Sequence, residues 1–392
     1  MTAMDSDRLL PRLKQSSESM YAKMTALALR FDAVNLGQGF PEDEPDPDLV
    51  SWVKQALDDF PNQYVSPRGI LSFRNAIARC TAKRYDVEVD PEKEILVTNG
   101  AEGGLTSVFL SMVEPGDEIV TFAPYYLHIK DKAALVGAKV VVVPMSVEGE
   151  LDFEAIGNAI TPKTKLIIVN SPSNPLGRVF TKFELEKIVE RTMHSNALYV
   201  FDDAYEFFVY DGKTHVNGLS LSKIRERAIV VSSLGKTLCA TGWRIGYNLA
   251  SPKLIDAMAI AHLQMAYCVP GHLQIGCEKA LSRSHAIYDE RAKDFAERRD
   301  QMCNGLKDMG IPVTKPGGGF FVTVAAKEFG YSNDVELASV LVKEAQCATI
   351  PLSTCFEEPK AEHHRIRFCF VKSPKTIKNG LNNIKKWLGA KI

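Results

Sequence analysis

The sequence lacks the features that mark membrane-embedded, secreted and nucleic-acid-binding proteins. No hydrophobic run approaches the roughly 20 residues that a membrane-spanning helix needs, and the N-terminal residues lack the apolar core of a signal peptide. Lysine and arginine number 47 against 48 aspartate and glutamate residues, and neither sign forms a long run. We therefore expect no membrane or nucleic-acid partner and a cytoplasmic location.

The cysteines form no recognisable pattern either. All 8 are scattered between Cys80 and Cys369, without a C-x-x-C pair or a cluster with histidine. In a chain of 392 residues this spacing indicates reduced thiols, and it predicts neither a disulfide framework nor a metal site. No G-x-G-x-x-G turn follows a first strand, which disfavours a nicotinamide-dependent dehydrogenase.

What the sequence does contain is an alternation of strands and helices. Short runs rich in valine and isoleucine predict strands at residues 93–100, 117–124, 138–145, 163–172, 197–205 and 227–235. Helical stretches such as residues 181–196 lie between several of them. Continuous apolar strands that alternate with helices are typical of an α/β fold with a largely parallel sheet.

The pattern changes after about residue 285. A long charged helix over residues 286–310 is followed by a glycine-rich entry into a strand, the strand 364–371 and a last helix. This order indicates an α+β unit. We predict a large α/β domain over residues 46–284 and a smaller α+β domain formed by residues 1–45 and 285–392.

The ends of the predicted strands present chemically useful groups, and ligands of open α/β sheets bind at the carboxyl ends of strands. The first strand runs into Gly100 and Ala101 and then a helix, where backbone N–H groups suit a phosphate. The later strand ends carry aromatic, amide, acidic, hydroxyl and cationic side chains: Tyr125, Tyr126, Asn170, Asn174, Asp202, Asp203, Tyr205, Ser233, Lys236 and Arg244.

Each of these groups taken alone has an ordinary structural explanation. A Gly-Ala pair after a strand is most often a tight turn, the asparagines lie in turn-forming sequence, and Asp202 can cap a helix. Together, however, they meet the needs of one ligand, pyridoxal phosphate. Its aldehyde forms a Schiff base with a lysine, and its pyridine nitrogen needs a carboxylate. Its ring needs an aromatic neighbour, and its phosphate needs N–H groups, a hydroxyl and a cation.

With these residues in view, the sequence resembles the class I and II aminotransferases of fold type I. Within them it is most similar to the kynurenine aminotransferase and glutamine transaminase K branch. The resemblance runs from "NLGQGFP" at residues 35–41 to "IRFCFVK" at 366–372, with "NSPSNPLGRVF" and "SSLGKT…ATGWRIG" as specific motifs between them. It implies ping-pong transfer of an amino group from an aromatic, glutamine, methionine or kynurenine-like L-amino acid to a 2-oxo acid. It also implies a homodimer with shared active sites.

The resemblance implies a catalytic role for three of these residues. Lys236 matches the Schiff-base lysine, and Asp202 matches the partner of the pyridine nitrogen. Tyr205 and Asn174 match the pair that binds the phenolate oxygen of the cofactor. Hydrogen bonds from this pair are expected to lower the pKa of the Schiff base.

The resemblance also implies a binding role for the residues around them. Arg367 is expected to hold the substrate carboxylate, beside Asn174 and the backbone of Gly39. Tyr64 matches a tyrosine that reaches the phosphate in the neighbouring subunit. The remaining cofactor contacts are the phosphate ligands and the stacking ring, which match Gly100, Ala101, Ser233, Arg244 and Tyr126.

Three positions depart from the kynurenine-type pattern. Glu102 stands where that branch tends to carry an aromatic residue, and Tyr267-Cys268 stands where an aromatic residue and histidine are usual. The segment 42–46 is unusually acidic. One interpretation is that Glu102 caps the helix or turns away and that the acidic segment is a solvated surface. The other is that Glu102 or Glu42–Glu44 attracts a substrate with a cationic side chain, so we count Glu102 and Tyr267 as candidate substrate-binding residues.

The reaction itself is not fixed by the fold. A cysteine-conjugate β-lyase or a specialised biosynthetic enzyme acting on a cationic amino acid can use the same lysine, aspartate and tyrosine. A regulatory protein with an aminotransferase-like effector domain needs a fused DNA-binding domain, for which we expect too little sequence before the matching region.

Overall fold

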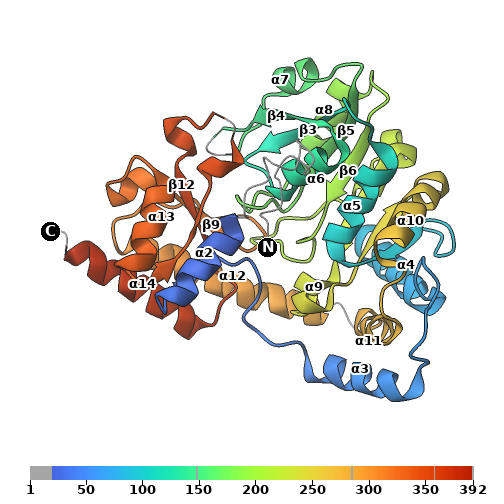
Figure 1. The fold of residues 1–392 in the computed structure, drawn as a ribbon, viewed down its shortest axis with the longest axis horizontal. Coiled ribbons are helices and arrows are strands. Elements are labelled where there is room, and N and C mark those ends of the chain that lie inside the picture. The colour runs from blue at the N-terminus through green and yellow to red at the C-terminus, as the bar shows by residue number, and fades with distance from the viewer. Residues whose placement is uncertain (1–19, 147–148, 284–285, 357, 391–392) are drawn as a thin grey trace, which may run out of the picture.

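The computed structural model describes residues 20–146, 149–283, 286–356 and 358–390 (Figure 1). Its centre is a seven-stranded sheet with the strand order β2-β8-β7-β6-β5-β3-β4. The six predicted strands are all present, and the structure places them as follows: β2 (Ile95–Thr98), β3 (Glu118–Ala123), β4 (Lys139–Pro144), β5 (Thr164–Asn170), β6 (Leu198–Asp202) and β7 (Ala228–Ser233). The strands from β7 to β4 are parallel, which confirms the predicted α/β class.

One strand of the sheet was not predicted. β8 (Gly246–Ala250) lies between β2 and β7 and runs antiparallel to both. Its middle residue, Asn248, is polar but fully buried, and its Nδ2 donates to the backbone oxygen of Gly104 at 3.2 Å. This hydrogen bond offsets part of the cost of burying the amide, and the polar residue interrupts the apolar run that identified the other six strands.

Helices cover both faces of the sheet, because neighbouring residues of each strand point to opposite sides. In β5, Leu166 and Ile168 pack beneath one set of helices, and Ile167 and Val169 pack beneath the other. The first set is α5 (Gly100–Met112), α6 (His128–Val136) and α10 (Pro252–Ala266). The second set is α4 (Leu71–Tyr85), α8 (Lys182–Thr192) and α11 (Gly271–Leu281), and α11 also packs against α3 (Pro47–Asp59).

The helix predicted over residues 181–196 begins where its sequence indicates. Thr181 is the N-cap of α8, and its hydroxyl accepts from the Glu184 backbone N–H while the Glu184 carboxylate accepts from the Thr181 N–H. This reciprocal capping box satisfies two N–H groups that a helix start leaves unpaired. The helix ends at Thr192, four residues before the predicted end at residue 196, because residues 193 and 194 form a turn.

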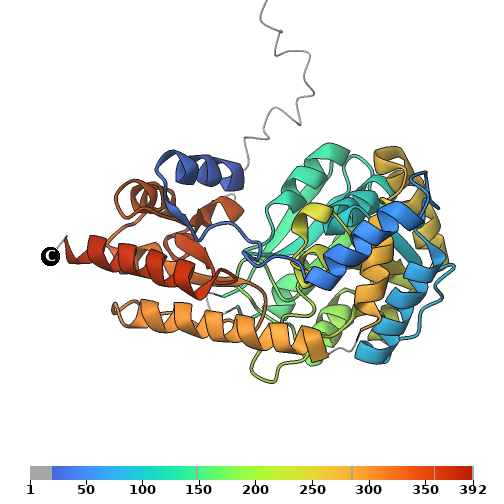
Figure 2. The same ribbon diagram turned by 90° about the horizontal axis from the view of Figure 1, so that it is seen from below.

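A second part of the molecule is built from the C-terminal third of the chain and from α2 (Met20–Arg30). Its antiparallel sheet has the order β11-β12-β9, and its second, two-stranded sheet pairs β1 with β10. The elements are β1 (Val34–Asn35), α12 (Ala286–Lys307), β9 (Phe321–Ala325), α13 (Asp334–Lys343), β10 (Cys347–Ala348), β11 (Ile350–Pro351), β12 (Arg365–Cys369) and α14 (Pro374–Gly389). Figure 2 shows α12 and α14 side by side along this part.

The predicted domain boundaries stay predictions. Residues 1–19, assigned by that prediction to the small domain, lie outside the described residues, as do residues 284 and 285 at its second boundary. Within the described ranges, no helix is both long and apolar enough to cross a lipid bilayer.

Candidate active site

A cavity of about 320 Å³ opens at the carboxyl ends of the parallel strands, against the second part of the molecule. It brings together residues from Tyr21 to Arg367, from opposite ends of the described chain. Most of the predicted site residues line it: Gly39, Ala101, Glu102, Tyr126, Asn174, Asp202, Tyr205, Ser233, Lys236, Arg244 and Arg367. The structure therefore brings these residues together around one cavity.

Lys236 projects into this cavity from α9 (Leu234–Thr237), a short helix that directly follows β7. Its Nζ donates a hydrogen bond to the backbone oxygen of Gly39 at 2.6 Å. Burial lowers the pKa of the Lys236 amine to about 8, and the nearby guanidinium of Arg367 acts in the same direction. A lowered pKa leaves part of the amine unprotonated at neutral pH, and this is the form that attacks a carbonyl.

Asp202 and Tyr205 face the same cavity from the end of β6 and the turn that follows it. Burial raises the pKa of the Asp202 carboxyl to about 7, and repulsion from Asp203 and Glu102 adds to this effect. A buried carboxylate with so high a pKa gains most from a cationic partner. Burial also raises the pKa of the Tyr205 hydroxyl, so this group stays protonated and can donate a hydrogen bond.

Arg367 closes the opposite side of the cavity from β12. Its Nη1 donates to Asn174 Oδ1 at 2.8 Å, and its Nη2 donates to the backbone oxygen of Gly37 at 2.7 Å. The guanidinium lies 4.0 Å from the ring centre of Phe321 and 5.1 Å from that of Tyr21. Its Nε is buried, and no residue of the described chain binds it. These contacts hold the Arg367 guanidinium group in a fixed orientation that suits a carboxylate.

An anion cradle lies at the start of α5. Gly100 has a φ of +68°, and a Cβ atom at this position would lie 3.1 Å from Arg244 Nη2. Within the described chain no side chain caps this helix, so its first N–H groups face outward together with the Ser233 hydroxyl and the Arg244 guanidinium. Glycine is needed here because any side chain would enter the space between the helix and Arg244.

Tyr64 and Tyr267 do not reach the cavity of their own chain. Their side chains are 77% and 47% exposed, and their ring centres lie 4.5 Å apart on the surface. The resemblance places both at a neighbouring subunit's site, and an exposed aromatic pair is compatible with that expectation.

Glu102 lines the cavity and takes part in a four-residue network. Its Oε1 accepts from the Tyr126 hydroxyl at 2.5 Å and lies 3.1 Å from His128 Nδ1, and its Oε2 forms an ion pair with Lys132. Burial acts to raise the pKa of the Glu102 carboxyl, but the bonds with His128 and Lys132 outweigh it and hold that pKa well below its ordinary value. The interpretation that Glu102 caps the helix or turns away is therefore wrong.

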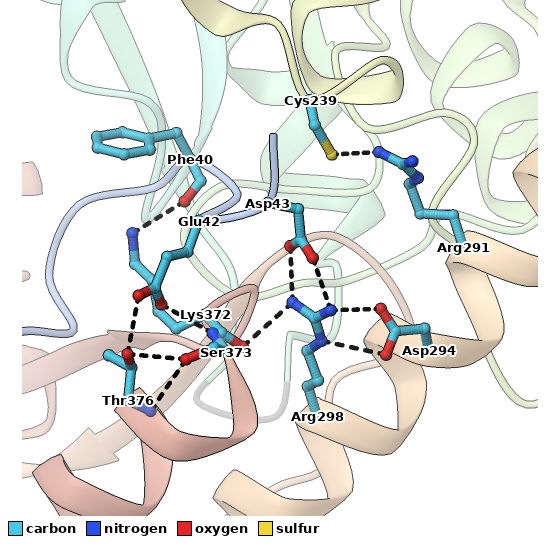
Figure 3. Close-up of polar contacts among 10 residues, drawn as sticks. All are labelled: Phe40, Glu42, Asp43, Cys239, Arg291, Asp294, Arg298, Lys372, Ser373 and Thr376. Carbon is cyan, nitrogen blue, oxygen red and sulfur yellow. Dashed lines mark hydrogen bonds and ion pairs between the residues drawn. The ribbon is translucent and has the colours of Figure 1, made fainter. Parts of the chain in front are cut away.

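The acidic segment is not a freely solvated surface either (Figure 3). Glu42 accepts from the backbone N–H of Ser373 at 2.8 Å and from the Thr376 hydroxyl at 2.9 Å, at the start of α14. Asp43 forms a two-pronged ion pair with Arg298 of α12, at 2.7 and 2.8 Å. The two carboxylates join the segment after Gly39 to both long helices, and this explains their presence without a substrate.

Several residues of the cavity were missed by the sequence analysis: Tyr21, Gln38, Phe40, Leu105, His128 and Phe321. Tyr21 comes from α2, far from any motif, and its place depends on how α2 packs against the second part. His128 could have been found, because it lies two residues after Tyr126 at the first turn of α6. Phe40 lies within the "NLGQGFP" motif, which was used only to recognise the family.

Comparison with known proteins agrees with this geometry. A family model described as "Aminotransferase class I and II" matches residues 32–384. The chain is 32% identical over 385 residues to the probable N-succinyldiaminopimelate aminotransferase DapC of Mycobacterium tuberculosis, covering 95% of this chain and 97% of that protein. It is 29% identical over 412 residues to kynurenine–oxoglutarate transaminase 1 of Mus musculus, covering 96% of this chain and 97% of that protein.

A solved structure gives the same answer. N-Succinyldiaminopimelate aminotransferase from Mycobacterium tuberculosis matches with a TM-score of 0.94 at 31% identity, covering 97% of this chain and 100% of that chain. The predicted fold type and the predicted family are both confirmed. The chain belongs to the class I and II aminotransferases and is a pyridoxal-phosphate-dependent transaminase.

Proposed function

We propose that the amino donor of this transaminase is an L-amino acid with an aromatic or other side chain without a positive charge, such as kynurenine, glutamine, methionine or phenylalanine. The observation that carries this proposal is the pairing of Glu102 with Lys132, which leaves the cavity wall without a spare negative charge for a cationic side chain. Tyr21, Phe40 and Tyr126 give the same wall a largely aromatic surface. One of the relatives above acts, by its name, on kynurenine.

The residues present fit pyridoxal phosphate. The cradle that a Cβ at Gly100 would obstruct lies beside Arg244, which suits the phosphate, with Ala101 and Ser233 at its border. The buried Asp202 carboxylate suits the pyridine nitrogen, and Tyr126 offers a ring face. The chemistry that this cofactor supplies when bound is an aldehyde that takes up an amino group and a ring that accepts the electrons released at the substrate Cα.

The protein's own groups divide the remaining tasks. With the cofactor bound, Asp202 would hold a proton on the pyridine nitrogen. The Tyr205 hydroxyl and the Asn174 amide would each donate a hydrogen bond to the phenolate oxygen. Arg367 binds the substrate carboxylate, so that the Cα–H bond points towards Lys236. The Lys236 amine then takes the proton from Cα, as a general base with a pKa near the working pH requires.

The absorption spectrum of the purified protein tests this function. A yellow band is expected to bleach when a donor is added without an oxo acid, and to return when a 2-oxo acid follows. Kynurenine, glutamine, methionine or phenylalanine should bleach it at least about tenfold faster than arginine or lysine. Release of ammonia without a stable bleached form would indicate the β-lyase alternative. Fastest bleaching by arginine or lysine would contradict the donor class and favour the cationic alternative.

We also propose a cytoplasmic homodimer in which Tyr64 and Tyr267 complete the partner's site. The exposed Tyr64–Tyr267 pair supports this, and two-fold dimers are the commonest protein assembly. Replacing Tyr64 by phenylalanine should weaken cofactor binding about tenfold, because one hydrogen bond to a charged group is lost. Light scattering should give twice the mass of 43.4 kDa for both proteins. A monomer, or an unchanged cofactor affinity, would contradict the shared site.

A further inference from the structure

A negative charge lies unusually close to the anion cradle. Glu102 belongs to the first turn of α5, next to Ala101, and its carboxylate lines the cavity. The N-terminus of a helix stabilises one anion through its unpaired N–H groups and its dipole. The Glu102 carboxylate lies beside the place where the proposed function puts the cofactor's phosphate. Two anions would therefore share the N-terminus of α5.

The carboxylate is needed for the position of a ring. The Tyr126 hydroxyl donates to Glu102 Oε1 at 2.5 Å, and His128 Nδ1 lies 3.0 Å from the same hydroxyl. These contacts fix the aromatic side chain that borders the cofactor space. Removing the carboxylate to relieve repulsion would therefore release Tyr126.

Lys132 neutralises the Glu102 carboxylate and leaves its contact with Tyr126 in place. It projects from α6, is only 5% exposed, and its Nζ forms an ion pair with Glu102 Oε2. It is not among the residues that line the cavity, so its nearest route to the cofactor is through Glu102, with a weaker charge effect on Asp202. A buried ammonium group so close to a single carboxylate cancels its charge with little screening by water.

We propose that Lys132 is a positioning residue that sets the affinity for the phosphorylated cofactor by neutralising Glu102 beside the phosphate site. This inference rests on the proposed placement of pyridoxal phosphate at the start of α5. Because the proposed effect is one of charge, replacing Lys132 and replacing Glu102 should change the affinity for the phosphorylated cofactor in different directions. A purely structural role of the pair would not produce this difference.

The test is a titration of the cofactor-free protein with pyridoxal phosphate and, separately, with pyridoxal, followed by absorbance. In Lys132→Met the unpaired Glu102 carboxylate should weaken pyridoxal phosphate binding at least about tenfold and leave pyridoxal binding within about threefold. Glu102→Gln should bind pyridoxal phosphate at least as tightly as the unchanged protein. The affinity of the double variant for pyridoxal phosphate should lie within about threefold of that of the unchanged protein, because the pair again carries no net charge.

Thermal unfolding separates these effects from misfolding. Glu102→Gln is expected to be the least stable single variant, because it leaves the buried ammonium of Lys132 unpaired. Lys130→Met, at an exposed lysine of the same helix, is the matched control and should not change cofactor affinity. Equal weakening of pyridoxal and pyridoxal phosphate in Lys132→Met, or no recovery in the double variant, would overturn the inference. If the unchanged protein itself fails to bind pyridoxal phosphate, the proposed function fails instead.

Discussion

Lys236→Met is expected to lose transaminase activity by about 10⁴-fold, because no other lysine of the described residues lines the cavity where the Cα proton is taken. The cavity should still bind the cofactor through the anion cradle and Asp202, but without the covalent bond to the protein. Gel filtration should therefore separate the cofactor from the variant and not from the unchanged protein. Activity is measured as oxo-acid formation from a saturating donor.

The matching stability measurement excludes a folding defect. Burial holds the pKa of Lys236 at about 8 in the native state, against an ordinary value of 10.5 that unfolding restores. Between these values the unfolded chain keeps a proton on Lys236 that the native chain has released, so the destabilisation caused by Lys236 in the cofactor-free protein should shrink as the pH increases from about 8 to 10.5. Below pH 8 the buried ammonium costs up to about 3 kcal/mol. Lys236→Met should therefore be more stable than the unchanged protein at pH 7, and this difference should disappear towards pH 10.5. Residual activity above about 1% in a stable variant would contradict the catalytic role.

Arg367→Gln is expected to lower kcat/KM for the amino donor by about 10³-fold, mostly through KM. The loss removes a charged, two-pronged partner of the substrate carboxylate that is fully desolvated in the protein. Steady-state kinetics over a range of donor concentrations measures it. Cofactor affinity should fall much less than kcat/KM, because Arg367 reaches the proposed cofactor site only through its bond to Asn174, while the anion cradle and Asp202 stay in place.

Arg365→Gln is the control for this variant. Arg365 lies two residues earlier on the same strand, bonds Thr323, and is not among the residues that line the cavity. Its replacement removes the same charge and should change KM less than about twofold. If both variants raise KM equally, the effect comes from the strand and not from recognition of the carboxylate.

The parallel strands were predictable because each is rich in apolar residues, even in the edge strand β4, which is mostly only partly buried. β8 escaped because Asn248 interrupts its apolar run, and the buried amide there bonds Gly104, Ser107 and Met258. The start of α8 was predictable from Thr181, since a capping box is a local signal. Its end was not, because the residues after Thr192 turn away without a glycine or proline to mark the change.

The same difference separates the site residues that were predicted from those that were missed. Lys236, Asp202 and Arg367 lie in motifs that the chemistry constrains, so sequence alone identified them. Tyr21 is placed by the packing of α2, for which the sequence carries no local sign, whereas His128 lies close enough to Tyr126 in the sequence to have been considered. Lys132 neutralises the charge that Glu102 would otherwise present to the cavity. The two residues lie 30 positions apart in the sequence, and only the fold brings them together.

Residues 37–43 make the two sides of the cavity mechanically inseparable. The oxygen of Gly37 accepts from Arg367, and the oxygen of Gly39, only two residues further along, accepts from Lys236. The far end of the same segment is fastened to α12 through Asp43 and Arg298 (Figure 3). A tilt of that helix displaces both carbonyl groups together. Arg367 holds the substrate carboxylate, and Lys236 takes the substrate proton. The distance between these two residues is therefore set by the length of one peptide segment, also when the two sheets move relative to each other.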